Sequence, residues 1–148
     1  MTGWRVGFAG GPKDIIANMS KIQSQSTSGS SAVSQAAAVA ALTGPQEFLI
    51  DRTSNLQRRR DILFKKLNKS KGLKCDLPEG AMYIFCCCAG NIGRKAPNGK
   101  LIETDEDFTM YLLESAGVAV VQGNAYGLSP YFRASFVAPE ADLVRGGD

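Results

Sequence analysis

"LKCDLPEGAMYIFCCC" (residues 73–88) contains two short strand-like runs on either side of the turn Pro78-Glu79-Gly80. Proline and glycine favour turns because of their backbone geometry, and the apolar and aromatic residues of the second run suit a strand. The stretch begins just after Gly72, where a long polar helical pattern ends. It therefore predicts two short strands joined by a turn.

A polar loop and a helix are expected next. The loop is NIGRKAPNGKL (91–101), and the helix lies in TDEDFTMYLLESAG (104–117), with Thr104 as its N-cap and Gly117 as its C-terminal stop. The acidic residues that follow Thr104 lie in the first turn, where they complement the helix dipole. The N-cap and the terminal glycine together define both limits of the predicted helix.

The remaining C-terminal residues predict two more strands. Residues 118–121 are expected to form a strand, 122–130 a glycine-rich loop, and YFRASFV (131–137) a closing strand. The tail APEADLVRGGD (138–148) starts like a helix and stops after barely two turns. Arg133 lies within the closing strand, between Phe132 and Phe136.

A long helix is expected upstream of residue 73. Gly44 and Pro45 interrupt the preceding helix, and Thr43 with Gln46 fits a capping box that opens a new helix, which runs to about Lys71. Its apolar residues form one narrow stripe, Leu49, Leu56, Leu63 and Leu67. A narrow stripe suggests a helix that bridges two bodies.

The first 44 residues predict a strand and two helices. In MTGWRVGFAGG (1–11), strand-forming residues alternate with Arg5 on the opposite face. Helical spacing follows in PKDIIANMSKIQ (12–23), and then a Ser- and Gly-rich loop leads to an alanine-rich helix, SAVSQAAAVAAL (31–42), with a serine N-cap. Because strands and helices alternate along the chain, the predicted fold class is α/β, in two bodies joined by the long helix.

Composition narrows the possible functions. The chain has 148 residues, 44% of them hydrophobic and 21% charged, with neither an apolar run of membrane-spanning length nor a signal-peptide pattern, so we expect a cytoplasmic protein. Histidine is absent, which excludes Ser-His and Cys-His nucleophile pairs and His-ligated zinc. Any catalytic chemistry must therefore come from Lys, Tyr or carboxylate side chains, or from a bound cofactor.

The charge pattern and the cysteines suggest neither a nucleic-acid nor a metal site. The net charge is +3, and the basic residues that crowd 58–74 have a single aromatic residue, Phe64, among them, so a solvated helix face is favoured over nucleic-acid binding. Cys75 and the run Cys86-Cys87-Cys88 lack zinc-knuckle spacing, and neighbours on a strand face opposite ways. We interpret them as reduced, apolar fillers of a strand.

Arg5 and Arg133 are the candidate functional residues. A guanidinium in a largely buried strand is costly unless its charge is paired, and its planar fork binds carboxylate or phosphate oxygens in a bidentate way. Each arginine therefore implies either an internal Asp or Glu partner or an anionic ligand. Residue type alone favours the internal partner.

Four stretches carry a family resemblance that favours the ligand. MTGWRVGFAGGPKDIIANMSKIQSQSTS (1–28) resembles the segment that follows the cofactor lysine of class I pyridoxal-phosphate aminotransferases, bacterial aspartate aminotransferases above all. PEGAMYIF (78–85), TDEDFTMYLLESAGVAVVQGNAYG (104–127) and PYFRASF (130–136) resemble the small domain of these enzymes, in the same order. The resemblance covers nearly the whole chain.

The resemblance implies a fold, a cofactor and two site residues. The fold is that of fold type I enzymes dependent on pyridoxal phosphate (PLP). Residues 1–44 would be a remnant of the large cofactor-binding domain, and residues 45–71 the connecting helix. Residues 72–148 would be the small C-terminal domain, truncated in its last helix. Arg5 would bind the phosphate of PLP, and Arg133 the α-carboxylate of the amino-acid or 2-oxo-acid substrate. No membrane or nucleic-acid partner is implied.

The same resemblance places several family residues before Met1. They are the Schiff-base lysine, the acid beside the pyridine nitrogen and a tyrosine near the cofactor, so we expect the isolated chain to be inactive. A serine, Ser24, stands where some aspartate-specific relatives have an arginine, which leaves specificity for aspartate open. Ser28 is expected to be an ordinary loop hydroxyl.

Two kinds of function therefore stay open. One is the C-terminal portion of an aspartate-type aminotransferase, completed by a separate N-terminal chain. The other is a non-catalytic remnant or interaction module that keeps the small-domain fold. In the second case, exposed apolar patches would favour a homo-oligomer.

Overall fold

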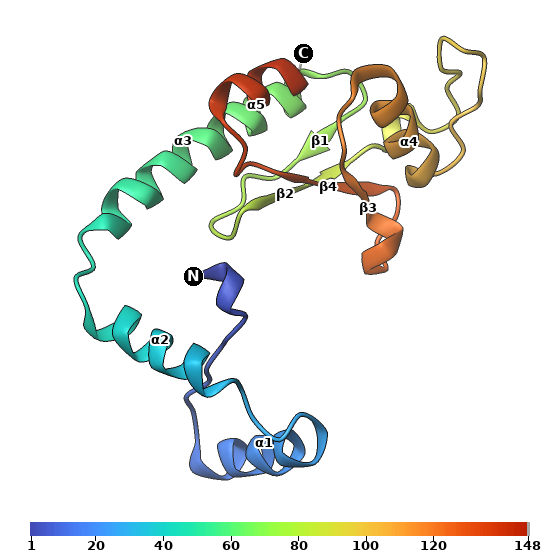
Figure 1. Cartoon of the computed structure of the whole chain (residues 1–148). Coiled ribbons are helices and arrows are strands. Elements are labelled where there is room, and N and C mark those ends of the chain that lie inside the picture. The colour runs from blue at the N-terminus through green and yellow to red at the C-terminus, as the bar shows by residue number, and fades with distance from the viewer. Residues whose placement is uncertain (148) are drawn as a thin grey trace. The chain divides into compact units, whose positions relative to one another are not determined.

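A computed structural model describes residues 1–147 of the chain. The chain divides into two compact units, Met1–Phe48 and Leu49–Asp148, which are described separately below. Figure 1 shows the elements of each unit. None of the helices in the described residues is long and apolar enough to cross a membrane.

The first unit is helical. After a short 3-10 helix, η1 (Thr2–Trp4), it contains α1 (Lys13–Ser26) and α2 (Ala32–Thr43), as the sequence predicts. Ser31 is the N-cap of α2, although its side chain makes no capping hydrogen bond. Gly44 ends that helix with its backbone N–H on the carbonyl of Ala40.

The predicted opening strand is wrong. Residues 1–11 contain η1 followed by an irregular extended segment, and Arg5 closes η1 in the left-handed conformation, with φ of 48°. A strand is stable only when a neighbouring strand pairs with its backbone N–H and C=O groups. The described residues of the first unit contain helices but no strand that could pair with residues 1–11. Alternation of side chains was therefore not enough to form a strand here.

The long helix is α3 (Phe48–Lys69), slightly shorter than predicted. The predicted capping box is also wrong. The Thr43 hydroxyl donates to the carbonyl of Val39 at 2.9 Å, and the Gln46 amide donates to the carbonyls of Ala41 and Gly44, both at 2.8 Å. Both side chains thus bond to carbonyls around the end of α2, and the Gln46 amide reaches one in its last turn, Ala41, that lacks a helical partner.

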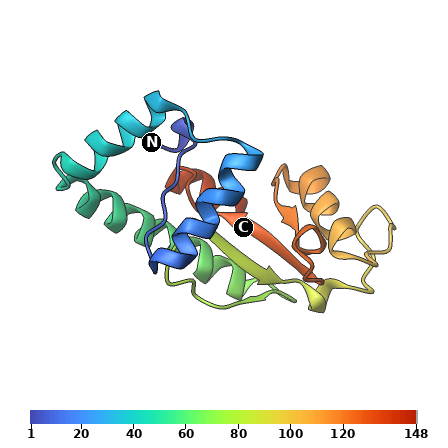
Figure 2. The same ribbon diagram turned by 90° about the horizontal axis from the view of Figure 1, so that it is seen from below.

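The second unit is built on an antiparallel sheet with strand order β1-β2-β4-β3. The strands are β1 (Lys74–Cys75), β2 (Tyr83–Cys87), β3 (Val121–Gln122) and β4 (Tyr131–Ser135). Figure 2 shows β2 and β4 side by side, with Phe85 opposite Arg133 in the register. The strand predicted for 118–121 is wrong for residues 118–120, because the ladder with β4 includes only Val121 and Gln122.

Helix α4 (Asp105–Ala116) confirms its predicted ends. The Thr104 hydroxyl accepts the Asp107 N–H at 3.1 Å, and the Asp107 carboxylate accepts the Thr104 N–H at 3.1 Å, which completes a capping box. Gly117 ends the helix in the left-handed conformation, with φ of 66°. Two 3-10 turns, η2 (Ala89–Asn91) and η3 (Gly123–Tyr126), and the short helix α5 (Glu140–Gly146) complete the unit.

The core of the second unit lies on one face of the sheet. Ile84, Cys86 and Phe132 are fully or almost fully buried there. Helices contribute the buried Leu63, Leu67, Phe108 and Leu143. Helices α3 and α5 lie side by side (Figure 1), joined by hydrogen bonds such as Lys66 Nζ to the Val144 carbonyl at 2.7 Å.

The cysteines belong to this core. Cys75, Cys86 and Cys88 are buried, Cys87 is half-buried, and all four are free thiols. Burial raises the pKa of Cys88 to about 11 and raises that of Cys86 further. Uncharged, inaccessible thiols of this kind behave as small apolar groups, as the sequence indicates.

Candidate functional site

The opposite face of the sheet carries Arg133. Along β2 and β4 every second residue is buried in the core, and the intervening positions face the other way. Arg133 is half-buried on this second face, with Phe85 opposite it on β2 and Tyr131 two residues away on its own strand. Strand alternation thus removes this arginine from the core.

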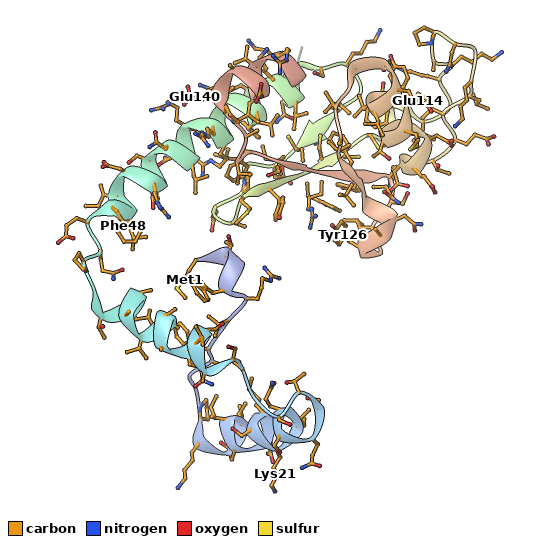
Figure 3. The ribbon with its side chains drawn as sticks, in the orientation of Figure 1. Met1, Lys21, Phe48, Glu114, Tyr126 and Glu140 are labelled. Carbon is orange, nitrogen blue, oxygen red and sulfur yellow. The ribbon has the colours of Figure 1, made fainter. Side chains whose placement is uncertain are left out.

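Two tyrosine rings enclose the guanidinium. The Arg133 Cζ lies 4.2 Å from the ring centroid of Tyr83 and 4.7 Å from that of Tyr126, which are cation–π distances. Tyr83 comes from β2, and Tyr126, which is labelled in Figure 3, comes from the turn η3. Contacts with two rings restrict the positions that the guanidinium can take.

Arg133 has no acidic partner in the part of the chain that the structure describes. Within residues 1–147, the side-chain ion pairs and hydrogen bonds of the arginines do not include any made by Arg133. The internal Asp or Glu partner that residue type favours is therefore wrong for Arg133. Its positive charge is available to an anion from outside the chain.

Further aromatic contacts hold the enclosing rings. Phe85 stacks on Tyr131, with centroids 5.3 Å apart, and meets Tyr126 edge to face at 6.1 Å. The sequence did not indicate Tyr83 or Tyr126 as members of this site. Tyr83 could have been found from strand alternation, since it lies two residues from Phe85 on the same face, but Tyr126 depends on the path of a turn.

The turn that carries Tyr126 is fixed from two directions. The Asn124 N–H donates to the Asp105 carboxylate at 2.8 Å, which ties η3 to the first turn of α4. At Gly123, an added Cβ would lie 2.1 Å from the Leu128 carbonyl oxygen, so only glycine fits. The position of Tyr126 is thus set by tightly packed backbone.

Arg5 lies in different surroundings in the first unit. Its side chain is exposed, and a surface hollow of about 500 Å³ is lined by Met1, Thr2, Arg5, Val6 and Gly7. The backbone beside it is held by the Ser34 hydroxyl, which donates to the carbonyl of Trp4 at 2.9 Å. No ion pair involves Arg5 within the described residues, so its charge is available as well.

Comparisons with known proteins identify the family. A sequence profile described as "Aminotransferase class I and II" matches residues 1–145. The chain belongs to this aminotransferase family. Its α/β structure is a fragment of the fold type I aminotransferase structure, since it resembles the crystal structure of the Rhizobium meliloti aspartate aminotransferase with a TM-score of 0.86 and 55% identity. That match covers 99% of this chain and 37% of the other.

Other relatives point to the same group of aminotransferases. The aspartate aminotransferase of Rhizobium meliloti strain 1021 is 57% identical over 97% of this chain, and the probable aspartate/prephenate aminotransferase of Rhizobium leguminosarum is 51% identical over 97%. A Thermus thermophilus aspartate aminotransferase structure with maleate gives a TM-score of 0.78 at 35% identity, over 99% of this chain and 36% of the other. The chain spans 35% of the length of the first of these relatives and 36% of the second.

The two serines noted above have local roles in the structure. The Ser24 hydroxyl donates to the carbonyl of Lys21 at 2.8 Å, within α1. Ser28 adopts a left-handed conformation, with φ of 63°, in the loop between α1 and α2. Ser24 thus has a local hydrogen-bond partner, and Ser28 lies in a loop, as expected from the sequence.

Proposed function

We propose that this chain is the C-terminal portion of a PLP-dependent aspartate-type aminotransferase, which transfers an amino group between an amino acid and a 2-oxo acid. Membership in the aminotransferase family supports the reaction class, and the names of the Rhizobium relatives support an acidic amino acid as one substrate. In this proposal residues 1–44 belong to the large domain, 45–71 form the connecting helix and 72–148 belong to the small domain. We also propose a cytoplasmic location for the protein.

The observation that carries the proposal is the guanidinium of Arg133, which contacts two tyrosine rings and has no acidic partner within residues 1–147. Both substrates of an aminotransferase have an α-carboxylate, and a planar guanidinium binds two carboxylate oxygens at once. Tyr83 and Tyr126 lie at cation–π distance from the Arg133 Cζ, and such contacts leave the N–H groups of an arginine able to bind those oxygens. Arg133 is therefore the substrate-binding residue of the proposal.

Arg5 fits the phosphate of PLP in two respects. Its guanidinium is exposed and unpaired within the described residues, and it borders a hollow next to Gly7, where an added Cβ would meet no neighbour within 4 Å. A dianionic phosphate suits such a guanidinium. When bound, PLP supplies the electron sink for amino-group transfer, while Arg5 would orient it and Arg133 would orient the substrate.

A polypeptide of these 148 residues is proposed to have no turnover by itself. The resemblance places the lysine that holds the cofactor outside residues 1–148, and the described lysines lie mostly on polar, solvent-facing segments. Proton transfer at the substrate carbon needs a base with a matched pKa, which a solvated lysine does not provide. The other part of the site would come from the remaining two-thirds of an aminotransferase.

A second candidate function is an interaction module. Large apolar side chains of the first unit are exposed, including Phe8 at 81% and Ile22 at 72%. Exposed apolar surface of this kind marks contact with another protein or another copy of the chain. Light scattering tests this candidate, since a strict monomer at high concentration contradicts it.

A chimaeric enzyme tests the main proposal. The corresponding segment of the Rhizobium meliloti aspartate aminotransferase is replaced by this chain, and transamination of aspartate is measured. We expect an active chimaera, whereas the 148-residue chain alone shows no turnover. Arg133→Lys should raise KM for both substrates at least about tenfold, since it removes the bidentate contact.

Arg145→Lys is the matched control, because Arg145 is exposed and pairs with Asp142 on α5. It should leave KM unchanged. An active chimaera in which Arg133→Lys and Arg145→Lys behave alike would refute the role of Arg133. Arg5→Ala should instead weaken binding of PLP, which is measured by titration of the cofactor.

A further inference from the structure

Asp105 is a buried carboxyl group with no basic partner in the described part of the chain. Its side chain is 2% exposed, and within residues 1–147 no basic side chain forms an ion pair with it. Burial of an unpaired carboxylate costs free energy unless N–H groups replace its water. Asp105 lies in the first turn of α4, where the helix dipole favours negative charge, but Thr104 and Asp107 already form the capping box of that helix.

The carboxylate of Asp105 holds the turn that carries Tyr126. It accepts the N–H of Asn124 at 2.8 Å, and Asn124 lies two residues before Tyr126 in η3. The next hydrogen bond of the turn is internal, from the Gly127 N–H to the Asn124 carbonyl at 3.0 Å. Asn124 is thus bonded to Asp105 through its N–H and to Gly127 through its carbonyl.

We infer that Asp105 is a positioning residue for the carboxylate-binding arginine. It acts through Asn124 on Tyr126, whose ring centroid lies 4.7 Å from the Arg133 Cζ. A charged acceptor forms a stronger and more directional bond to an N–H than a neutral acceptor does. The functional consequence for substrate affinity rests on the proposed function of Arg133, but the positioning itself does not.

The direct test uses NMR on the full 148-residue chain. Protons of the Arg133 side chain lie close to two aromatic rings, so their resonances are displaced by the ring currents of Tyr83 and Tyr126. Asp105→Ala should shift them toward ordinary arginine values, by the same amount as Tyr126→Leu does. Combining both substitutions should add no further change, because both remove the same contact.

Asp107→Ala is the matched control. It removes a carboxylate from the same turn of α4 and breaks the capping box, but Asp107 makes no bond to η3. The Arg133 resonances should therefore stay in place. Asp105→Asn, whose amide oxygen can still accept the Asn124 N–H, should restore most of the displacement.

Two results would overturn the inference. One is an Asp105→Ala chain with unchanged Arg133 resonances, and the other is an equal shift in Asp107→Ala, which would mean a general loss of helix α4. Hydrogen exchange on the unsubstituted chain gives a check that needs no variant. The Asn124 amide should be protected at least as well as Gly127, and fast exchange at Asn124 would contradict the bond.

A kinetic measurement separates this inference from the proposed function. In the chimaera, Asp105→Ala should raise KM for the amino acid about two- to tenfold, the range of a cation–π contact, with a smaller effect on kcat. If Arg133→Lys raises KM and Asp105→Ala does not, the positioning role fails while the substrate role stands. If neither changes KM while the NMR shifts occur as expected, the function of Arg133 fails and the positioning stands.

Discussion

The two units of the chain differ in how they bury apolar side chains. The second unit has a contiguous core in which Ile84 and Cys86 have no exposed surface. In the first unit Ser34 is buried, whereas Trp4, Phe8 and Ile22 are at least half exposed. Local signals such as caps and helical spacing are therefore sufficient to form helices, but a core needs residues that are distant in sequence.

The same contrast explains the two arginine-bearing segments. Residues 131–135 form β4, because β2 and β3 lie on either side and take its backbone hydrogen bonds. Residues 1–11 have a similar alternation of side chains but no described strand in their unit to pair with. Arg133 therefore has a fixed place in a sheet, and Arg5 lies in an exposed segment.

The largest expected difference between the units is in the cost of removing a phenylalanine. Phe132 is 1% exposed and packs on Phe108 with centroids 5.6 Å apart, so Phe132→Ala should destabilise the chain by about 3–5 kcal/mol. Phe8→Ala, at an 81% exposed position, should cost less than about 0.5 kcal/mol. Urea unfolding followed by circular dichroism measures both, with the fluorescence of Trp4 as a separate signal from the first unit.

A large cost of Phe8→Ala would break the contrast, because it would mean that Phe8 is packed in solution. That result would also support the interaction module. Dilution distinguishes the two sources of packing. A cost that falls as the protein is diluted comes from contacts between copies of the chain.

Thiol reactivity gives the next largest effect, and it tests whether the core of the second unit stays closed. Burial raises the pKa of Cys88 to about 11, so at pH 8 its thiolate fraction is about 100-fold below that of a thiol with pKa 9. Cys87 is half-buried and should be alkylated by iodoacetamide first. Mass spectrometry of timed samples measures the order, and equal rates at Cys87 and Cys88 would show an open core.

Helix capping sharpens the comparison at a smaller scale. The Thr104 hydroxyl accepts a backbone N–H at the start of α4, so Thr104→Ala should cost about 1 kcal/mol. Ser31 has the same position at the start of α2 but makes no side-chain capping bond, so Ser31→Ala should have little effect. Urea unfolding of both variants measures the difference, and equal costs would mean that the Ser31 cap forms in solution.

Much of the second unit could be predicted from sequence, because its signals are local. The capping residues Thr104 and Gly117 fix α4, and the turn at 78–80 separates β1 from β2. The extent of β3 could not be predicted in this way, since it depends on how far β4 continues as a partner. The structure of residues 1–11 could not be predicted either, because their sequence does not reveal whether a partner strand is present.

The residues of the candidate site also differ in whether the sequence alone could reveal them. Arg133 could be recognised from its place in an apolar strand, and its resemblance to an aminotransferase motif named its role. Tyr126 and Asp105 could not be recognised, because they meet Arg133 and Asn124 through the fold of a turn. Residues proposed to bind a ligand are thus easier to find in a sequence than residues proposed to position them.

The smallest expected effect is a pH dependence confined to the second unit. Lys100, at 3.1 Å, and the hydroxyl of Thr104 hold the pKa of Asp107 at about 2, below its usual value near 4. Because the unfolded chain binds this proton more readily, the stabilisation is complete above about pH 4 and is lost as pH falls toward 2. Asp107→Asn should flatten the loss of stability between pH 4 and pH 2, measured by urea unfolding at each pH. The exposed Arg145–Asp142 pair offers a comparison, and an Asp142→Asn variant that flattens the curve equally would show that the effect is not specific to the α4 cap.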